Sequence, residues 1–344
     1  MPVNTGGTAE HLRLNKLLSE VTYQRGIGEA GIGTQLIPLV KSPKISNTYL
    51  VIPRLRSDAN IRIERAPGEN VKEVERQGRE YDTFVCQDRR IKLKIPLEIS
   101  EGMGDAELLE EKKQKAIEIL HMVETSHERS VHNTFWASKG NQNDITAKFQ
   151  DIYGNDRVVR PAATSGFSGL KWDADDAKVR EDVMHGMDIV QKACGYKPNT
   201  MVMTPEAFRK ILNADNDFSK SYLYTKPGGV SMNELREYLG IPNILVPRVL
   251  VDGSAPISEE NPEVAKDWMW KGASAGLFYV NPARSRNMIT LGSSFYWDSP
   301  IARWLQVKEG WNENNMSWEV QTGGYFTVKP VDFSCGLVFT DIIG

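Results

Sequence analysis

GDAELLEEKKQKAIEILHMVETSHERSVHNTFWAS, residues 104–138, is the stretch that decides the fold of this 344-residue chain. It contains no proline and no glycine after Gly104, and its apolar residues recur at helical spacing. These apolar residues are Leu109, Ala116, Leu120, Val123, Val131 and Phe135. The pattern predicts one amphipathic helix over 105–138, with Asp105 capping its first turn and Gly140 just beyond its end. At about 1.5 Å per residue this helix is a rod of roughly 50 Å, so we expect it to act as a spine for the flanking segments.

The composition is that of an ordinary globular protein without a bias toward polyanions. The net charge is −3, from 45 acidic and 42 basic residues, which is not the balance of a dedicated nucleic-acid reader. Cys86, Cys194 and Cys335 are scattered and lack C-x-x-C spacing, which argues against a disulfide framework or a structural zinc site and favours a reducing cytosol. The sequence contains no apolar run long enough for a membrane span and no signal-peptide pattern.

The segment before the spine is expected to be extended. Gly26, Gly28 and Gly31 satisfy G-x-G-x-x-G, but they do not lie between a strand and a helix, so an extended arm over 1–40 is favoured over a dinucleotide site. Strands are predicted over 49–55 and 91–99, and Pro96 places the second near a sheet edge.

The segment 54–80 between these strands carries seven basic and six acidic residues and few apolar ones. Such a long segment cannot bury a core of its own. We therefore expect a two-stranded arm, with a turn at 66–68, that pairs with a neighbouring subunit; a solvated charged loop is the alternative.

After the spine, a turn-rich connection over 141–172 leads to a second domain. Its helix is predicted to begin near Asp173 as N-cap and to end at Gly195. A strand over 199–203, a helix capped by Thr204, a helix over 232–239 and a strand over 244–246 follow. Alternating strands from residue 295 to the end complete an α+β protein with a mixed sheet and helices on its faces.

A catalytic site on the spine is the competing interpretation. Glu124 and His127 form an E-x-x-H element of the type found in carboxylate-bridged di-iron sites, with His121, Glu128 and His132 nearby. Such a site needs a second E-x-x-H, and the nearest candidate, Asp182 with His185, is only D-x-x-H. A polar helix face is therefore favoured, and the sequence predicts no catalytic residue, no cofactor and no metal.

The order of these parts resembles the major capsid proteins of tailed bacteriophages, whose fold is shared with encapsulins and herpesvirus capsid floors. The segments NTMVMTPEAFRKIL (199–212) and ELREYLGIPNILVPRVL (234–250) look like parts of that family's axial domain. The resemblance implies the following division: an N-terminal arm over 1–40, an extended β-hairpin loop over 54–80, a peripheral domain over 41–53 and 81–172 with the spine helix over 105–138, an axial domain over 173–300, peripheral strands and a loop over 301–330, and a closing axial strand over 331–344.

The resemblance also implies a function. It is that of a structural, non-enzymatic major capsid protein, which self-assembles as hexamers and pentamers into an icosahedral head around double-stranded DNA. The implied partners are other copies of the chain, a portal, a decoration protein and packaged DNA held non-specifically. The sequence shows no charged N-terminal scaffolding domain, which implies either a separate scaffolding protein or a mature form from which residues were removed. The implied location is the virion capsid, with assembly in the host cytoplasm and no membrane contact. The alternatives are an encapsulin-like nanocompartment shell and an α+β metal-dependent enzyme.

Candidate contacts between subunits lie in the charged loop and in a later turn. They are Arg54, Arg56, Arg62, Arg65, Glu69, Lys72, Glu73, Arg76, Arg79, Trp311, Asn312 and Asn315. Some members of the family crosslink a loop lysine to an asparagine of a neighbour, and Lys72 with Asn312, Asn314 or Asn315 has a comparable placement. Ordinary turn chemistry is favoured for these residues.

Overall fold

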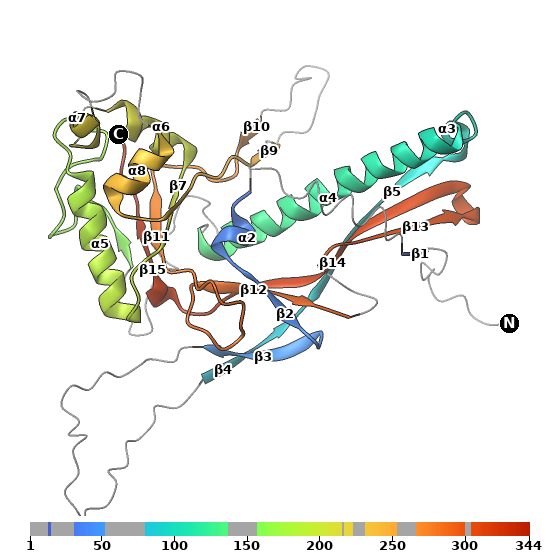
Figure 1. Cartoon of the computed structure of the whole chain (residues 1–344), viewed down its shortest axis with the longest axis horizontal. Coiled ribbons are helices and arrows are strands. Elements are labelled where there is room, and N and C mark those ends of the chain that lie inside the picture. The colour runs from blue at the N-terminus through green and yellow to red at the C-terminus, as the bar shows by residue number, and fades with distance from the viewer. Residues whose placement is uncertain are drawn as a thin grey trace, which may run out of the picture.

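The computed structural model describes residues 13–14, 31–51, 80–136, 157–214, 217–222, 231–252, 266–299 and 304–344. In these ranges the chain forms a six-stranded sheet, a five-stranded sheet and two two-stranded ribbons. A long helix runs along the first sheet and reaches toward the second (Figure 1). None of the helices in these ranges has the length and apolar content needed to cross a lipid bilayer.

The spine helix is α4 (Asp105–Phe135), which confirms the predicted helix through Phe135; positions 137–138 lie outside the described residues. Its 31 residues give a length of about 46 Å. The expected cap is wrong, because Gly104 is the N-cap and its N–H donates to Glu107 Oε2 at 3.2 Å. Leu109 is also misassigned to the apolar stripe, since it is 39% exposed near the free end of the helix.

The first sheet is built around β14, the longest strand. Its order is β1-β13-β14-β12-β2, with β5 along the other side of β14, and only the β2–β12 pair is parallel. The strands are β1 (Arg13–Leu14), β2 (Leu39–Ser42), β5 (Gln87–Pro96), β12 (Gly292–Trp297), β13 (Gln306–Asn312) and β14 (Ser317–Pro330). β13 pairs with the first half of β14 and β12 with the second half, so one strand spans the whole sheet.

α4 covers one face of this sheet. Period-two alternation turns Val320 and Phe326 of β14 toward the helix, where they pack with Ala116, Ile119 and Val123. The result is a long, two-layered body of helix on sheet.

β5 ends earlier than predicted. It lies at an edge, as Pro96 indicated, because β14 is its only strand partner among the described residues. However, the predicted continuation to residue 99 is wrong, since Leu97 and Ile99 belong to the helical turn α3 (Leu97–Ser100). Pro96 has no N–H to offer a ladder, and the Leu97 N–H donates to the Met316 carbonyl at 3.0 Å as the chain turns.

A two-stranded ribbon leaves the body of the molecule. β3 (Ser46–Val51) and β4 (Glu80–Val85) pair antiparallel, with Val51 opposite Glu80. The predicted strand over 49–55 therefore begins earlier, at Ser46. The described pairing supports a two-stranded arm at its root, while 52–79 lie outside the described residues.

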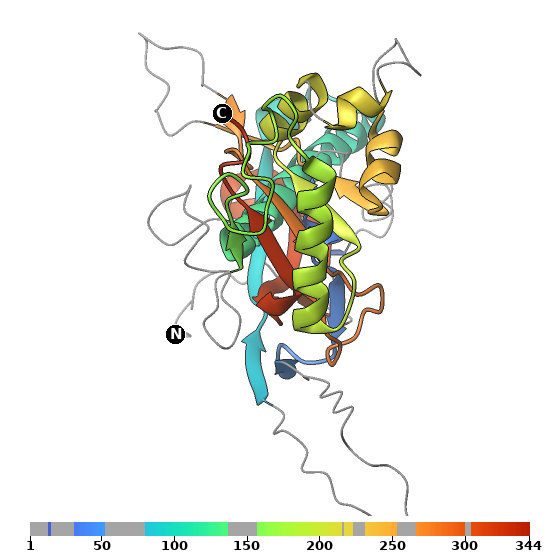
Figure 2. The same cartoon turned by 90° about the vertical axis from the view of Figure 1, so that its left-hand side faces the viewer.

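The second sheet has the order β6-β15-β11-β7-β8, and β11 is antiparallel to both of its neighbours. Its strands are β6 (Val158–Val159), β7 (Thr200–Met203), β8 (Asn243–Leu245), β11 (Ala275–Phe278) and β15 (Gly336–Phe339). The remaining elements are α2 (Gly33–Leu36), α5 (Val179–Cys194), α6 (Pro205–Asn213), α7 (Asp217–Tyr222), α8 (Met232–Leu239), η1 (Glu313–Asn315), η2 (Phe333–Cys335), and the ribbon of β9 (Leu250–Asp252) with β10 (Lys266–Trp268). Figure 2 shows α5 against this sheet, where Val183 and Met187 join a core with Leu277 and Phe339.

Local signals in the second domain are confirmed with one exception. Thr204 accepts from the Ala207 N–H, and Ser231 forms a capping box with Glu234. The cap expected from Asp173 is wrong: α5 begins at Val179, and the Val179 N–H donates at 3.2 Å to the carboxylate of Asp217. A cap supplied 38 residues later in the chain leaves no local sequence signal.

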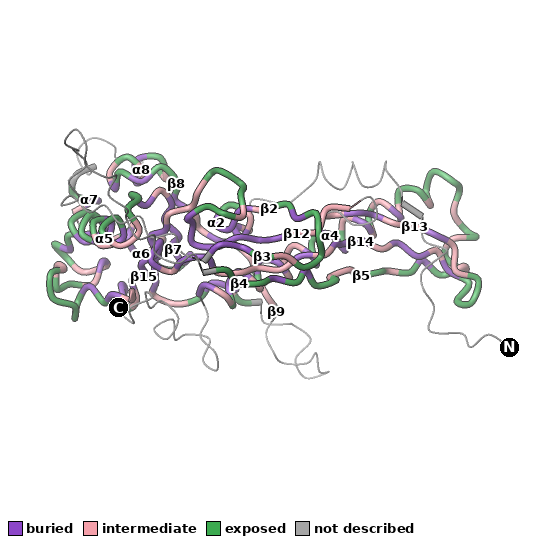
Figure 3. The backbone as a smooth tube through the Cα atoms, turned by 90° about the horizontal axis from the view of Figure 1, so that it is seen from below, coloured by how far each residue is buried: buried purple, intermediate pink, exposed green. Residues whose placement is uncertain are grey.

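The chain crosses between the two sheets at points that differ from the predicted domain boundaries. β6 pairs with β15 of the second sheet, although β6 lies before residue 173. Trp172 also precedes residue 173, and it packs in the core of the second sheet with its ring 5.0 Å from the Phe339 ring. β12 joins the first sheet although it precedes residue 300. Figure 3 shows that buried residues run along the middle of both sheets, while exposed residues gather at the end of the long body beyond β13.

Candidate functional site

The candidate functional site is the set of contacts that fixes the spine helix between the arm, the ribbon and the second sheet. At its outer half, Lys112 Nζ lies 3.4 Å from the centre of the Trp318 ring and 3.4 Å from Glu309 Oε2. Lys112 is 8% exposed. A lysine held this way locks α4 to the sheet through a cation–π contact and an ion pair.

The predicted contact turn lies at the far end of the long body. Trp311 of β13 packs edge-on against Trp318 of β14, with ring centres 5.7 Å apart. Asn314 and Asn315 are exposed in η1, and Met316 follows with a positive φ of 43° and 61% exposure. The end of the body therefore offers exposed side chains on a backbone fixed by two tryptophans.

Asn312 is already engaged within the subunit. Its Nδ2 donates to Glu319 Oε1 at 2.9 Å, and its Oδ1 accepts from the Asn314 N–H at 3.1 Å. Both oxygens of Glu319 also accept from Lys92 Nζ at 3.0 Å, and the Glu319 side chain is fully buried. The structure thus brings Asn312, Asn315 and Trp311 together at one end; the nine predicted contacts between Arg54 and Arg79, Lys72 among them, lie outside the described residues.

The root of the ribbon is tied to the end of β14. The Tyr49 hydroxyl lies 2.9 Å from Asp82 Oδ2 and 3.0 Å from the Pro330 carbonyl. Burial, and then the hydrogen bond with Asp82, raises the pKa of Tyr49, while the same hydrogen bond lowers the pKa of Asp82. Phe84 stacks on Phe295 with ring centres 4.1 Å apart, so the ribbon leaves the body from a packed base.

Glu128 of α4 holds the point where the N-terminal segment enters the fold. Its Oε2 accepts from the Gly33 N–H at 2.5 Å, and its Oε1 accepts from Trp270 Nε1 at 2.8 Å. We call Glu128, Gly33 and Trp270 the arm clamp. A Cβ at Gly33 would lie 2.6 Å from Glu128 Oε2, so the close approach requires glycine. Burial raises the pKa of Glu128, and its hydrogen bonds oppose this rise.

His127 is buried beside the clamp. Its Nε2 lies 2.8 Å from Ser294 Oγ of β12, and its ring packs edge-on against Trp304 and Phe326 at 5.1 and 5.5 Å. Burial, and then the charge of Arg89, lowers the pKa of His127 to about 3. The imidazole is therefore neutral at pH 7, and it joins the helix to the sheet.

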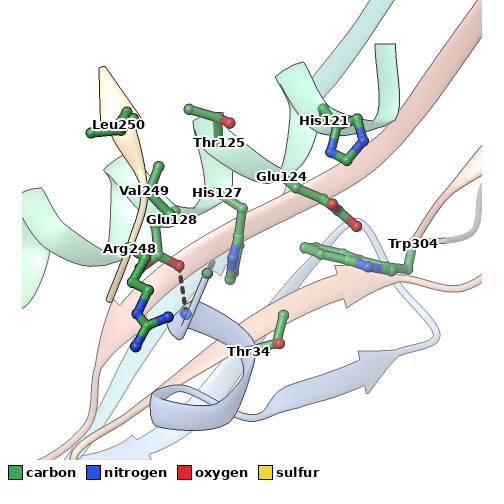
Figure 4. Close-up of a pocket in the computed structure, with 12 residues that line it drawn as sticks. Thr34, His121, Glu124, Thr125, His127, Glu128, Arg248, Val249, Leu250 and Trp304 are labelled. Atoms are coloured by element: carbon green, nitrogen blue, oxygen red, sulfur yellow. Dashed lines mark hydrogen bonds between the residues drawn. The ribbon is translucent and has the colours of Figure 1, made fainter. Parts of the chain in front are cut away.

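A cavity of about 280 Å³ adjoins these residues (Figure 4). Glu124 and His121 line it from α4, opposite Thr34, and Arg248 and Trp304 lie at opposite sides of it. Within the described ranges, no group of three His, Cys, Asp or Glu side chains is arranged to hold a metal ion.

The second half of the hypothetical di-metal site is not brought to the spine. Asp182 of α5 accepts from Ser168 Oγ at 2.7 Å and from Trp172 Nε1 at 2.9 Å, and His185 packs against Phe167. Both residues thus serve the second sheet. The sequence pattern missed the partners of Glu128, because Gly33 and Trp270 lie 95 and 142 residues away from it.

No protein-family model and no curated protein matches the chain in sequence. Solved structures do match its fold. A phage-related protein from Bordetella bronchiseptica has a TM-score of 0.70 and 16% identity, over 96% of this chain and 98% of that chain. A virus-like particle chain from Pyrococcus furiosus has a TM-score of 0.50 and 13% identity, over 94% and 97%. A chain of Microbacterium phage Oxtober96 has a TM-score of 0.50 and 9% identity, over 90% and 91%.

Proposed function

The chain has the shell-forming fold of phage major capsid proteins, which encapsulins share, and on this premise we propose that it is the major capsid protein of a tailed bacteriophage. In this role it self-assembles as hexamers and pentamers into an icosahedral head that encloses double-stranded DNA. The observation that carries the proposal is the fold match to a phage-related protein from Bordetella bronchiseptica, which extends over 96% of this chain and 98% of that chain. The protein is then structural and not an enzyme.

The geometry of the long body supports this role. A subunit that tiles a closed shell must hold its contacts at fixed distances, since small angular errors accumulate around the shell. The packing of α4 on β5, β13 and β14 gives a stiff body. The arm clamp fixes the point at which the N-terminal segment joins this body, and the ribbon root fixes the point at which β3 and β4 leave it. Repeated over many copies, modest contacts at the ends of these parts stabilise a large assembly.

We place the contacts between subunits at the charged segment 54–80 and at the turn formed by Trp311, Asn312 and Asn315. Opposite charges in the segment suit pairing with a neighbouring copy, and the turn is exposed at the end of the stiff body. Further partners in this role are a portal, a separate scaffolding protein, a decoration protein and packaged DNA held without sequence preference. Assembly takes place in the host cytoplasm, and the product is the virion capsid.

Deletion of residues 59–78 tests the assembly role. The variant should fold, because Tyr49, Phe84 and Phe295 keep the ribbon root packed, but it should no longer form closed shells. Circular dichroism and thermal melting establish folding, and electron microscopy scores assembly. Normal shells from the deletion variant would refute the role of this segment.

A crosslink between Lys72 and a turn asparagine of a neighbour has its own test. Boiled mature particles that run as a ladder on a denaturing gel, and as a monomer after Lys72→Arg, would establish it. A single monomer band from the wild type rules it out. Asn312 would have to leave its contacts with Glu319 and Asn314 in order to react, whereas Asn314 and Asn315 are exposed.

The second candidate is an encapsulin-like nanocompartment shell, since the virus-like particle from Pyrococcus furiosus matches the fold over 94% of the chain. The two candidates differ in their contents. Purified particles that contain phage DNA, portal and terminase support the phage head, whereas particles loaded with a co-purifying ferritin-like or peroxidase cargo support the nanocompartment.

A further inference from the structure

Basic and aromatic side chains gather where α5 ends, beside the loop that follows β11. The two segments are joined there, because the Asn199 side chain donates to the Val280 carbonyl at 2.7 Å and accepts from the Val280 N–H at 3.0 Å. The orange loop between β11 and β12 lies next to the lower end of α5 in both views (Figure 1, Figure 2). We call this surface the basic patch, and its members are Lys192, Tyr196, Lys197, Tyr279, Arg284 and Arg286.

The two segments that form the basic patch carry positive charge only. Residues 189–203 and 272–297 together contain two lysines and two arginines, and they contain no aspartate or glutamate. Even with Asp188, which lies one turn before Lys192 on α5, the patch keeps a net positive charge. The whole chain has a net charge of −3, so this surface departs locally from the average of the protein.

The four cations of the patch are not engaged by carboxylates of their own subunit. In the part of the chain that the structure describes, none of them has an ion-pair partner, whereas Lys171, Lys178 and Lys220 of the same domain each pair with a carboxylate. Three of the four are exposed and the fourth is partly exposed. Like charges gathered on one surface repel each other, and an anionic partner removes this repulsion.

The backbone that carries the patch is held in place. Asn281 closes the neck of the loop, because its Nδ2 donates to the Ile289 carbonyl at 3.2 Å and its N–H donates to Thr290 Oγ1 at 3.3 Å. The Tyr196 ring stacks on Tyr279 with centres 4.8 Å apart and planes at 12°, which ties the end of α5 to the start of the loop. A fixed backbone loses less conformational entropy when its side chains bind a ligand.

The residue types of the patch suit a phosphate backbone. The loop reads Arg-Ser-Arg-Asn over 284–287, and each of these side chains can donate a hydrogen bond to a phosphate oxygen. The hydroxyl of Tyr196, a residue that is 36% exposed, can do the same. Basic residues interleaved with aromatic ones are typical of surfaces that bind nucleic acid without reading its sequence.

We propose that the basic patch is the surface through which this chain holds duplex DNA by its phosphates. The proposal rests on the function proposed above, since it takes the enclosed DNA as the ligand, and it adds the residues that touch this DNA. Each neutralised phosphate contributes about 0.9 to the dependence of log Kd on log salt concentration, so four cations give a slope of about 3.6. Between 50 and 200 mM salt the affinity should therefore fall about 150-fold.

The test is fluorescence anisotropy of the purified full-length chain with a short labelled duplex of random sequence. The chain is kept below the concentration at which it assembles, as checked by light scattering. Arg284→Gln combined with Arg286→Gln should halve the slope to about 1.8, so that affinity falls only about 12-fold over the same range of salt. Lys197→Gln, a change on the other segment, should lower the slope by about 0.9 and serves as a second variant.

The matched control is Lys113→Gln combined with Lys115→Gln. These two lysines have the same spacing as the two arginines, but they lie on α4 and pair with glutamates. The control removes the same charge from another surface, so it should keep the slope of the wild type. Circular dichroism and thermal melting show that each variant is folded before its slope is compared.

Three results would overturn the proposal. The first is a wild-type chain that does not bind the duplex at 50 mM salt, and the second is an equal slope in the arginine variant and the lysine control. The third is an arginine variant that binds DNA like the wild type but no longer assembles, which would make the patch a contact for an acidic surface of another copy.

Electron microscopy of the same preparations, at concentrations that permit assembly, separates this proposal from that of the capsid. Closed shells from the wild type together with unchanged DNA binding in the arginine variant would refute the basic patch and leave the capsid function standing. A wild-type chain that forms no shells would refute the capsid function, whatever its DNA binding.

Discussion

His127 makes the stability of the protein fall as the pH is lowered from 7 to 5. The folded protein keeps this imidazole neutral, with a pKa of about 3, because it is 2% exposed between Trp304 and Phe326. In the unfolded chain its pKa returns to about 6.5. Below that value the unfolded state binds a proton that the folded state does not, so stability is present above pH 6.5 and is lost as the pH falls toward the folded pKa.

The size of the effect follows from the two pKa values. A pH of 5 lies about 1.5 units below the pKa of the unfolded chain, and each unit lowers the free energy of the unfolded state by about 1.36 kcal/mol through protonation. The total is about 2 kcal/mol. The result hardly changes if the folded pKa is one unit higher, because both values lie below pH 5. For a protein with a net stability of about 5–15 kcal/mol, this is a measurable fraction.

Urea denaturation at pH 7 and pH 5 measures the effect, with His127→Gln compared with the wild type. Other groups also titrate in this range, so the quantity to compare is the stability lost between the two pH values in each protein. We expect this loss to be about 2 kcal/mol smaller in His127→Gln. His121→Gln, which removes an exposed histidine from the same helix, should behave like the wild type. Equal losses in His127→Gln and the wild type would refute the reasoning.

Two further predictions concern the spine helix. Glu128→Ala leaves the Gly33 N–H and Trp270 Nε1 buried without their acceptor, at about 1–3 kcal/mol each, so we expect a destabilisation of about 2–6 kcal/mol and faster hydrogen exchange at Gly33. An unchanged melting temperature together with unchanged exchange would contradict the clamp. Lys112→Met removes the cation–π contact with Trp318 and the ion pair with Glu309, and should cost about 1–2 kcal/mol in calorimetry. The control Lys113→Met removes only an exposed pair with Glu110 and should cost less than about 1 kcal/mol; equal costs for the two variants would contradict the role given to Lys112.

Features that depend on local sequence could be predicted from it. The spine helix follows from its apolar period and from the lack of internal glycine and proline, and the caps at Thr204 and Ser231 follow from hydroxyl side chains placed before helical segments. β5 ends early because of Pro96. The alternation of apolar and polar residues continues through Leu97 and Ile99, and it therefore predicted a strand where the chain is already helical. Period-two alternation continues across a proline, but strand pairing does not.

Features that depend on long-range contact could not be predicted. Asp217, which follows α6 in the sequence, caps α5, and Glu128 accepts hydrogen bonds from Gly33, 95 residues before it, and from Trp270, 142 residues after it. In the sequence Glu128 is one of several polar residues on a charged helix, and its burial becomes visible only in the fold.

The central claim, that this chain builds closed shells, is tested most directly by negative-stain electron microscopy of the purified full-length protein. The account predicts uniform hollow particles tens of nanometres across, made of hexamers and pentamers of the chain. A preparation that is folded by circular dichroism, yet contains only monomers or small discrete oligomers at all concentrations and salt conditions, would contradict it.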